Sequence, residues 1–403
     1  MSSAFRARSF LIVGTLFIVV ALVANEWVLG ARLTVGGRIT NPASRIVLAI
    51  FDIGALLVGL TLVVLRDRAP WKQMLLSVFA TVFTLAVAEG GLRLVFAARS
   101  WTTPQSRGIG GEIGWRPRAN LTVDRDLPAF GHVHYQTTRD GFRLYGDPGS
   151  AKRKVFVVGD SFTEGEHLST GETYYEILAG LRPDLEMFGI GGGGYGTLQE
   201  YMLVDEYVDR IKPALVIVQM HPNDLVNNSH ALESRSTTDN NQLTRPYWEN
   251  GRIVSKFPEN PGWGPLYNLA RHSYLLRLVN VNLTFLRAKS VGSVEQFARA
   301  DDPDVMRSVE TTAELLGMIQ KRAGVPIAVF SARPDNVFSF WSVSDVCRRA
   351  GVEFIPGVGE AVEAAQAAGE RVTGLPIDAH WNKRGNEIAA GVINEWINRS
   401  MSR

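Results

Sequence analysis

The hydrophobic pattern divides the chain into an apolar amino-terminal part and a longer part in which short apolar runs alternate with amphipathic stretches. Three long runs with few charges occupy residues 10–24, 46–65 and 74–97. Because roughly 20 apolar residues can cross the hydrocarbon core of a bilayer, the pattern predicts a membrane region over residues 1–100 with about three transmembrane helices. The first run could instead be a cleaved signal peptide, and a buried helical hairpin is the soluble alternative.

Basic residues flank these runs unevenly and indicate how the runs are oriented. Since Lys and Arg are enriched in cytoplasmic loops, their distribution predicts a cytoplasmic amino terminus. The chain after residue 100 is then expected on the extracytoplasmic, periplasmic side of the inner (cytoplasmic) membrane, whether or not the first run is cleaved. The basic residues assigned to the cytoplasmic side are Arg6, Arg8, Arg66, Arg68 and Lys72, and those assigned to the opposite side are Arg32, Arg38 and Arg45.

Charged side chains inside the apolar runs predict two further features. Glu89 and Arg93 are four residues apart, so on a helix they would pair on one face near the membrane interface. A carboxyl group inside a transmembrane helix usually faces protein or water and often marks a contact with a partner. Asp52 is therefore the candidate contact for another membrane protein, whereas Glu26 could lie at the interface.

Short apolar runs after residue 150 predict parallel strands separated by helices. A strand that is buried on both faces reads as a continuous apolar run, and strands that alternate with helices predict an α/β fold. We expect a flavodoxin-like three-layer αβα sandwich over residues 151–403. The predicted strands are 154–158, 185–188, 213–220, 325–330 and 352–355, and the clearest helices are 173–181 and 386–397.

Two segments do not fit this alternation. Residues 101–150 are rich in Gly, Pro, Arg and Trp and contain short alternating pieces, which predicts a collar or linker with short strands. Residues 229–300 form an insertion that is too long for a simple loop, and such insertions are often lids or binding surfaces. Its aromatic residues, which could instead pack a small core of their own, are Tyr247, Trp248, Trp263 and Tyr267.

Charge and cysteine content limit what the protein can bind. The 42 basic and 40 acidic residues give a net charge of +2, which provides no basic field for nucleic acid. The single cysteine, Cys347, cannot form an internal disulfide and is expected to be buried. His132 and His134 would share one face of a strand, but no third ligand is evident, so no metal or other cofactor is predicted.

Polar residues suited to catalysis follow three of the predicted strands and precede the last helix. Gly-Asp-Ser ends at Ser161 after the first strand, a glycine run follows the second, and Asn223 follows the third. Asp378 and His380 come just before the terminal helix. Each segment alone is also a common sequence for a turn or for the cap of a helix. Together they supply a nucleophile, oxyanion donors, an orienting carboxylate and a base, at the sheet edge where α/β proteins build their sites.

These four segments resemble the sequence blocks of the SGNH (GDSL-like) hydrolase superfamily. The resemblance implies that Ser161 is the nucleophile, His380 the general base and Asp378 the partner of that base. It also implies an oxyanion hole formed by the backbone N–H of Ser161, the backbone N–H of Gly194 and the side chain of Asn223. The serine block is not the Gly-x-Ser-x-Gly elbow of α/β-hydrolases.

The resemblance covers roughly residues 150–400 and has two departures. Gly189 replaces the asparagine that often opens the second block, and His221 stands where the third block usually has glycine. The last block has the sequence Asp-x-His-Trp, which is similar to the corresponding sequence of the alginate O-acetylation proteins. This similarity favours acyl transfer to or from a glycan over simple lipase activity.

The expected function is that of a membrane-anchored extracytoplasmic serine esterase or O-acyltransferase. Its substrate would be an acyl ester, most simply an acetyl ester, of an envelope glycan or lipid, and Tyr247 and Trp248 are candidate contacts to it. A transferase with so few membrane helices would need a separate membrane protein as acyl donor, for which Asp52 is the candidate contact. The alternative is a non-catalytic subunit with the same fold that binds partners or glycan.

Overall fold

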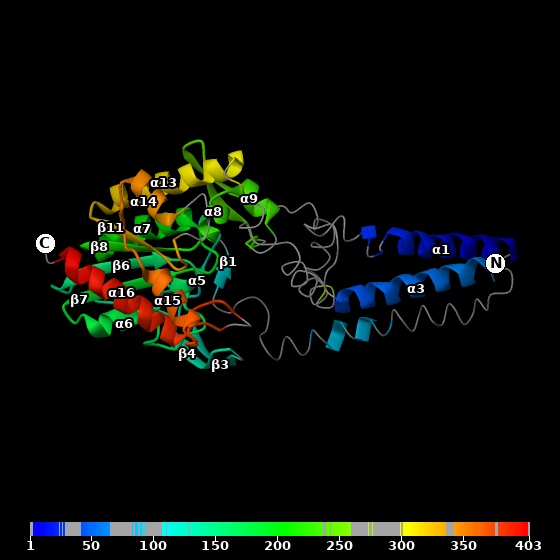
Figure 1. The fold of residues 1–403 in the computed structure, drawn as a ribbon, viewed down its shortest axis with the longest axis horizontal. Coiled ribbons are helices and arrows are strands. Elements are labelled where there is room, and N and C mark those ends of the chain that lie inside the picture. The colour runs from blue at the N-terminus through cyan, green and yellow to red at the C-terminus, as the bar shows by residue number, and fades with distance from the viewer. Residues whose placement is uncertain are drawn as a thin grey trace. The chain divides into compact units, whose positions relative to one another are not determined.

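The structure is a computed structural model of the chain, in which two compact units can be distinguished. The smaller unit comprises Met1–Trp101 and Pro261–Ser293, and the larger unit comprises Thr102–Asn260 and Val294–Arg403. The elements of both are drawn in Figure 1. The structure describes residues 3–23, 25, 27–28, 42–64, 83, 85–87, 89–91, 93, 107–109, 111–127, 129–236, 239–241, 243–258, 273, 276, 299, 301–335, 342–374 and 378–401.

Two long helices form most of the described part of the smaller unit. The helices α1 (Ser3–Val23) and α3 (Pro42–Val64) pack along each other. Their backbones approach closely at Gly14 and Gly59, where a Cβ on either glycine would lie 2.8 Å from the carbonyl oxygen of the other. Only glycine fits at such a close crossing of two helices.

The outer surfaces of these two helices carry exposed aliphatic side chains. Ile12 and Leu22 of α1 are 61% and 62% exposed, and Val64 at the end of α3 is 74% exposed. Other large apolar residues that are exposed on the pair are Leu16, Val19, Ile53, Leu57 and Leu60. A contiguous apolar surface of this kind is typical of a region that contacts lipid or another protein.

No helix in the part of the chain that the structure describes is both long enough and apolar enough to cross a membrane. The structure therefore does not support the predicted transmembrane helices over residues 1–100. The predicted pairing of Glu89 with Arg93 is confirmed, since Arg93 Nε donates a 2.8 Å hydrogen bond to Glu89 Oε1. Most of the third predicted run, 74–97, lies outside the described residues, as do Glu26, Arg32, Arg38, Arg66, Arg68 and Lys72.

A six-stranded sheet organises the larger unit. Its strands are β5 (Leu144–Tyr145), β6 (Arg153–Gly159), β7 (Leu185–Gly191), β8 (Leu215–Met220), β11 (Ile327–Ser331) and β12 (Glu353–Phe354). The strand order is β12-β11-β8-β6-β7-β5, and every neighbouring pair is parallel except β5 with β7. The five predicted parallel strands are confirmed in the 2-1-3-4-5 order of flavodoxin-like sheets. The antiparallel edge strand β5 comes from the predicted collar and was not expected in the sheet.

Helices cover both faces of this sheet (Figure 1). Those on one face are α7 (Thr197–Ile211), α13 (Pro303–Ala323) and α14 (Val343–Ala350), and those on the other are α6 (Tyr174–Leu181), α15 (Val358–Ala367) and α16 (Lys383–Met401). Strand side chains alternate between the two cores: Val158 and Val216 pack on the first side, and Val157 and Ile217 on the second. The arrangement is the predicted three-layer αβα sandwich. Cys347 of α14 is buried as predicted, and burial raises the pKa of its thiol to about 12.

Local sequence signals explain where the helices begin and end. Thr173 caps α6 in a capping box with Glu176, each side chain bonding the other's backbone N–H. At α13, Asp302 is the N-cap and Pro303 occupies the first helical position, where its missing N–H is not needed. Gly324 ends α13 in the left-handed conformation with φ 64°. These signals are local, so the helices were predictable from the sequence.

Short antiparallel hairpins and short helices complete the described part of the larger unit. They are β1 (Arg107–Ile109) with β2 (Trp115–Pro117), β3 (Thr122–Leu127) with β4 (Gly131–Gln136), β9 (Arg245–Glu249) with β10 (Arg252–Lys256), and the helices α5 (Ser161–Glu164), α8 (Asn223–Asn227) and α9 (His230–Arg235). The segment predicted as a collar contains β1 to β5, and these short strands belong to the same compact unit as the sheet. Part of the predicted insertion, 261–293, groups with the smaller unit, and Trp263 and Tyr267 lie outside the described residues.

The paired histidines of β4 lie on the surface. His132 Nδ1 is 3.1 Å from Asp126 Oδ1, and His134 Nδ1 is 3.1 Å from Asp124 Oδ2. All four side chains are about half exposed or more. Their partners are therefore the carboxylates of the neighbouring strand, as expected for exposed cross-strand pairs.

Candidate active site

Ser161 lies at the carboxyl end of β6, where the strand turns directly into α5. Asp160 caps this short helix, because its carboxylate accepts a 2.9 Å hydrogen bond from the N–H of Phe162. Gln219 Oε1, on the neighbouring strand β8, accepts a 3.1 Å hydrogen bond from the Asp160 N–H. A Cβ at Gly159 would overlap the Gln219 side chain, so glycine is required at the end of the strand. The turn therefore fixes the position of the Ser161 hydroxyl at the sheet edge.

The structure brings Ser161, His380 and Asp378 into one hydrogen-bonded chain. His380 Nε2 lies 2.7 Å from Ser161 Oγ, and His380 Nδ1 lies 2.6 Å from Asp378 Oδ1. The backbone N–H of His380 donates a further 2.9 Å hydrogen bond to the same carboxylate oxygen. Because Asp378 accepts at Nδ1, the imidazole hydrogen is held there, and Nε2 is left to accept the hydroxyl proton.

Two backbone hydrogen bonds connect Gly374 with the segment that contains Asp378 and His380. The Gly374 N–H donates to the carbonyl of His380, and the Gly374 carbonyl accepts from the N–H of Asp378, both at 3.1 Å. The ring of Phe162 lies 4.9 Å from that of His380 and 5.0 Å from that of Trp381, measured between centroids. The residue after the serine therefore packs directly against the histidine loop and keeps the two segments together.

The electrostatic environment of His380 favours the protonated form of its imidazole. Burial by itself lowers the pKa of His380, but the hydrogen bond and the charge of Asp378 outweigh burial and raise the pKa above its usual value. Burial likewise raises the pKa of Asp378, yet the hydrogen bonds and charge of His380 dominate and hold this pKa well below its usual range. Asp378 therefore stays ionised and stabilises the protonated form of His380.

The predicted oxyanion donors lie on loops at the same edge of the sheet. Gly194 follows β7 and Asn223 opens α8 after β8, and these two strands flank β6. Gly194 has φ 72°, a left-handed conformation that favours glycine. Within the described residues, the N–H of Ser161, the N–H of Gly194 and Asn223 Nδ2 have no protein acceptor. All three donors are therefore free to bond a ligand oxygen.

His221, the unexpected residue of the third block, orients Asn223. Its Nδ1 lies 2.8 Å from Asn223 Oδ1. Burial lowers the pKa of His221 to about 3, so the ring is neutral and can donate from one nitrogen. The same Nδ1 lies 3.3 Å from the backbone nitrogen of Asn223. In the tautomer with the hydrogen on Nδ1, the ring donates to the amide oxygen, and Asn223 Nδ2 faces away from the histidine as the predicted donor.

A buried and a partly buried side chain hold the glycine run around Gly194 from two sides. On one side, Glu164 Oε2 accepts a 2.6 Å hydrogen bond from the Gly193 N–H. On the other, Asn241 Nδ2 donates a 3.3 Å hydrogen bond to the Gly194 carbonyl. The backbone N–H of Asn241 donates in turn to Glu233 Oε1 at 3.2 Å. None of these supporting side chains was singled out by the sequence, because they come from three separate segments.

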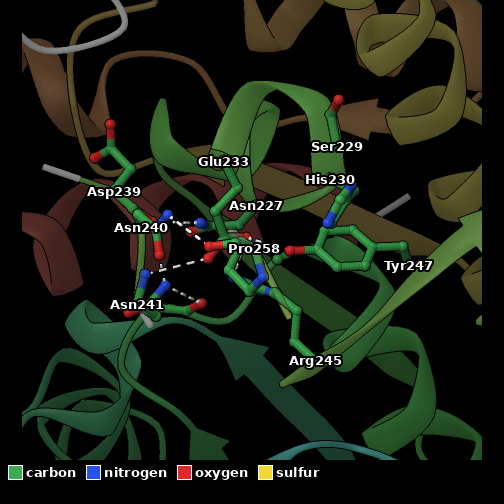
Figure 2. A network of polar contacts seen from close by, with 12 residues as sticks. Asn227, Ser229, His230, Glu233, Asp239, Asn240, Asn241, Arg245, Tyr247 and Pro258 are labelled. Atoms are coloured by element: carbon green, nitrogen blue, oxygen red, sulfur yellow. Dashed lines mark hydrogen bonds and ion pairs between the residues drawn. The ribbon is translucent and has the colours of Figure 1, made fainter. Parts of the chain in front are cut away.

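Figure 2 shows Glu233 among the side chains that surround Asn241. Glu233 Oε2 accepts hydrogen bonds from Arg245 Nη1 at 3.1 Å and from the Tyr247 hydroxyl at 3.0 Å. Glu233 and Arg245 are 0% and 1% exposed, so they form a fully buried ion pair. Burial and the charge of Glu233 raise the pKa of Tyr247, so the phenol remains a donor. The Tyr247 hydroxyl is thus engaged inside the protein.

The other predicted substrate residue, Trp248, lines a cavity of about 550 Å³ together with Tyr247. The cavity lies between α9, the β9–β10 hairpin and the first half of α13. Trp248 is half-buried there and offers an aromatic face, whereas Tyr247 forms part of the wall. The triad residues Ser161, Asp378 and His380 do not line this cavity. The structure therefore does not bring the two predicted substrate residues to the nucleophile.

His167, which the sequence analysis did not single out, lies beside the triad. Its Nε2 is 3.6 Å from Asp378 Oδ2, and its ring centroid is 4.9 Å from that of His380. The ring also stacks on Phe130 of the β3–β4 connection, with 4.8 Å between centroids and 14° between planes. Burial and the neighbouring His380 lower the pKa of His167. Ligand atoms of His167, Asp378 and His380 lie within 4.8 Å of one another, close enough for a metal ion.

Arg143, also missed by the sequence analysis, holds the loop that carries His167. Its side chain is 4% exposed, and its guanidinium lies 4.0 Å above the Tyr135 ring. The guanidinium donates hydrogen bonds of 2.6 to 3.3 Å to the carbonyls of Glu164, Gly165, Leu168 and Ser169. The segment predicted as a collar therefore shapes the wall of the site.

Two buried carboxyl groups lie behind the nucleophile and the oxyanion loop. Glu200 of α7 and Asp224 of α8 are both 0% exposed. Asp224 Oδ2 accepts a 2.6 Å hydrogen bond from the His221 N–H, whereas neither oxygen of Glu200 has a hydrogen-bond partner within the described residues. Burial and the charges of Asp224 and Asp160 raise the pKa of Glu200 well above its usual value, and burial and Asp160 do the same for Asp224. Such carboxyl groups retain protons that they would lose in water.

Comparison with known proteins finds likeness among solved structures. No protein-family model matches the sequence, and no curated protein matches it. A member of the lipolytic protein G-D-S-L family from Veillonella parvula is similar, with 10% identity and a TM-score of 0.36 over 62% of this chain and 100% of that chain. TesA is similar at 11% identity and a TM-score of 0.36 over 61% of this chain and 99% of its own.

A third similar structure is a catalytic mutant of Axe2, an acetylxylan esterase from Geobacillus stearothermophilus. It has 13% identity and a TM-score of 0.34 over 61% of this chain and 94% of that chain. Because the identities and TM-scores of all three are low, conclusions about function rest on the residues of the site. The predicted similarity of the last block to alginate O-acetylation proteins finds no counterpart among these three and stays a prediction.

Proposed function

We propose that the larger unit is a serine ester hydrolase or O-acyltransferase of the SGNH type. The observation that carries this proposal is the chain from Ser161 Oγ through His380 to Asp378, with separations of 2.7 and 2.6 Å. These residue types in this order supply the nucleophile, the base and the carboxylate that orients the base. A non-catalytic binding subunit has no physical need for this combination, so the catalytic reading is the better supported of the two.

In the proposed reaction, His380 Nε2 accepts the hydroxyl proton while Ser161 Oγ attacks the ester carbonyl. Asp378 keeps the imidazole in the required tautomer and stabilises its positive charge. The N–H groups of Ser161 and Gly194 and the Asn223 side chain bond the oxyanion, and each such donor is worth roughly a hundredfold to a thousandfold in rate. His380 then protonates the leaving alcohol, and an acyl ester remains on the serine. Water or a sugar hydroxyl resolves that ester by the same steps in reverse.

We assign the substrate to the acyl esters, most simply acetyl esters, of an envelope glycan or lipid. The triad does not line the cavity beside Trp248, so this cavity would hold a part of a glycan chain away from the ester, where the aromatic ring stacks on a sugar ring and polar side chains bond hydroxyl groups. Polar residues that line the cavity are His230, Asn250, Glu310 and Glu314. Trp248 rather than Tyr247 carries this assignment, since the Tyr247 hydroxyl is bonded to Glu233.

We further propose that the protein acts at the inner membrane, with the larger unit on the periplasmic side. The exposed aliphatic surface of α1 and α3 supports contact with lipid, and the distribution of basic residues supports the orientation. In a transferase, a separate membrane protein would deliver the acyl group, and Asp52 of α3 is the candidate contact. Its Oδ1 is buried without a hydrogen-bond partner in the described part of the chain. A cytoplasmic signal from reporter fusions to the carboxyl terminus would refute this orientation.

Labelling of the nucleophile tests the catalytic proposal directly. The purified chain should hydrolyse p-nitrophenyl acetate and gain one adduct from a fluorophosphonate, seen by intact-mass analysis and mapped to Ser161. Ser161→Ala should lose both the activity and the adduct, while Ser150→Ala, a serine in a turn before β6, should keep both. A folded protein that gains no adduct, or an adduct that persists in Ser161→Ala, would favour the non-catalytic alternative.

A further inference from the structure

We propose that His167, Asp378 and His380 bind a divalent transition-metal ion such as Zn²⁺, and that the bound ion switches off the triad. Ligand atoms of the three side chains lie within 4.8 Å of one another. Two imidazoles and one carboxylate are a donor set that zinc uses in proteins, with a further position left for water. The binding itself does not depend on the proposed function; only the inhibition rests on it.

The separations around His167 fit a metal ion better than a hydrogen bond. His167 Nε2 lies 3.6 Å from Asp378 Oδ2 and 3.9 Å from Glu166 Oε1. Hydrogen bonds between nitrogen and oxygen span about 2.7 to 3.2 Å, so neither contact is one. Two ligands of a tetrahedral zinc ion lie roughly 3.3 Å apart, given bonds of about 2.0 to 2.1 Å. Side-chain rotations that bring His167 closer to Asp378 and widen the 2.6 Å contact between His380 and Asp378 would place the three side chains at ligand distance.

Charge and access also favour a cation at this place. Asp378 and Glu166 together carry two negative charges, which a divalent ion would neutralise. The side chains of His167, Asp378 and Glu166 are 14%, 27% and 19% exposed, so an ion can enter from solvent without opening the fold. His167 is preorganised by its stacking on Phe130. Arg125, which donates a 3.4 Å hydrogen bond to the Glu166 carbonyl, is an opposing positive charge that limits the affinity.

Metal binding would remove the general base. A neutral imidazole binds a metal only through the nitrogen that carries no hydrogen. If His380 binds through Nδ1, its hydrogen moves to Nε2, which then donates toward Ser161 Oγ and cannot accept the hydroxyl proton. If it binds through Nε2, the metal occupies the lone pair that must accept that proton. Either mode leaves the serine without a base and requires no change in the rest of the fold.

The experiment measures metal binding and ester hydrolysis separately on the metal-stripped full chain. Titration with ZnCl2 in a calorimeter should show one site, and CoCl2 should give the visible absorption of a four-coordinate cobalt ion. Ser161→Ala should keep the site, since its hydroxyl is not a ligand. His167→Gln should weaken Zn²⁺ binding at least tenfold and yield an enzyme whose ester hydrolysis Zn²⁺ no longer inhibits. His132→Gln, which removes an exposed histidine that also lies beside aspartates, is the matched control and should bind normally.

The outcomes separate this proposal from the proposed function. Equal Zn²⁺ affinity in the wild type and His167→Gln, or a site lost in His132→Gln instead, would overturn the metal site even in an active enzyme. Specific binding that depends on His167 in a protein without esterase activity would keep the site and refute the proposed function. Retained inhibition of His167→Gln by Zn²⁺ at unchanged concentration would show that the ion acts elsewhere.

Discussion

Asn241 lies against Gly194, and its side-chain amide donates a 3.3 Å hydrogen bond to the carbonyl of that glycine. The contact is close enough that a Cβ at Gly194 would overlap the Asn241 side chain. Asn241 is itself held by Glu233, whose other carboxylate oxygen is bonded to Arg245 and Tyr247 (Figure 2). This network therefore holds Gly194 at its carbonyl, in the peptide unit next to the one that carries the proposed oxyanion donor N–H.

Asn241→Ala should lower kcat for ester hydrolysis more than it changes KM. The substitution removes a bond to the Gly194 carbonyl, which helps to fix the backbone of the residue whose N–H is proposed to act only on the oxyanion. A positioning residue should cost less than the loss of a donor itself, so we expect a decrease in kcat of roughly tenfold to a hundredfold. Steady-state kinetics with p-nitrophenyl acetate measure the effect.

The neighbouring residue provides the control for this substitution. Asn240 is also partly buried, and its Nδ2 donates a 3.0 Å hydrogen bond to the carbonyl of Pro258 instead of to Gly194. Asn240→Ala should therefore leave kcat near the wild-type value. Equal losses in both variants, or a change confined to KM, would show that Asn241 only supports the fold.

The parts of the site that the sequence predicted all have local signals. Ser161 follows an apolar run that breaks at glycine, and Asp378 and His380 are two residues apart before a helix. The strands of the sheet were predictable for the same reason, because continuous apolar runs mark buried parallel strands. Gly194 and Asn223 were placed by the resemblance, and the structure puts their loops beside the strand of the serine.

What the sequence did not predict depends on contacts between distant segments. His167 and Arg143 lie in irregular segments without a motif, and only the packing of the β3–β4 hairpin brings them to the triad. Tyr247 was predicted to contact substrate, and this stays a prediction for a residue that lines the cavity beside Trp248. Its hydroxyl is bonded to Glu233, a contact between β9 and α9 that no local pattern encodes. Aromatic residues in an insertion pack inward as readily as they bind ligands.

The pH dependence of hydrolysis should report the link between Asp378 and His380. The base must be neutral to act, and the pKa of His380 is raised, so kcat/KM should rise with pH through a value above about 6.5. Asp378→Asn removes the charge that raises this pKa. The acid limb should therefore move to lower pH, and kcat should fall on the order of a thousandfold or more. The profile is measured with a neutral ester and EDTA, and an acid limb that does not move in Asp378→Asn would contradict the assignment.

Glu200→Gln should raise the stability of the protein at alkaline pH. The pKa of Glu200 is raised in the folded state by burial and by neighbouring carboxylates, so the folded state binds the proton more tightly than the unfolded chain. This contribution to stability is therefore complete below the unfolded pKa of about 4.3 and is lost as pH rises toward the folded pKa. A neutral amide removes the loss, so the substitution should stabilise the folded state at pH 8 relative to the wild type.

Urea unfolding at several pH values tests this expectation, with exposed Glu310→Gln on α13 as the control. The difference between Glu200→Gln and the wild type should grow as pH rises from about 4.5 to 8, whereas Glu310→Gln should follow the wild type throughout. A difference that stays constant with pH would indicate a change in packing rather than the removal of a titrating group.

Removal of Ser161 in the native host should change the O-acyl content of an envelope glycan or lipid, and the sign of the change distinguishes the two proposed activities. Both share the acyl-enzyme on Ser161 and differ in what resolves it: an esterase admits water, whereas a transferase positions a sugar hydroxyl. NMR of extracted envelope material from a Ser161→Ala strain should therefore show less acylation for a transferase and more for an esterase. Trp248→Ala sharpens the test, because loss of its aromatic face should impair action on the polymer while hydrolysis of p-nitrophenyl acetate persists. Unchanged acylation of every envelope polymer in the Ser161→Ala strain would count against both activities.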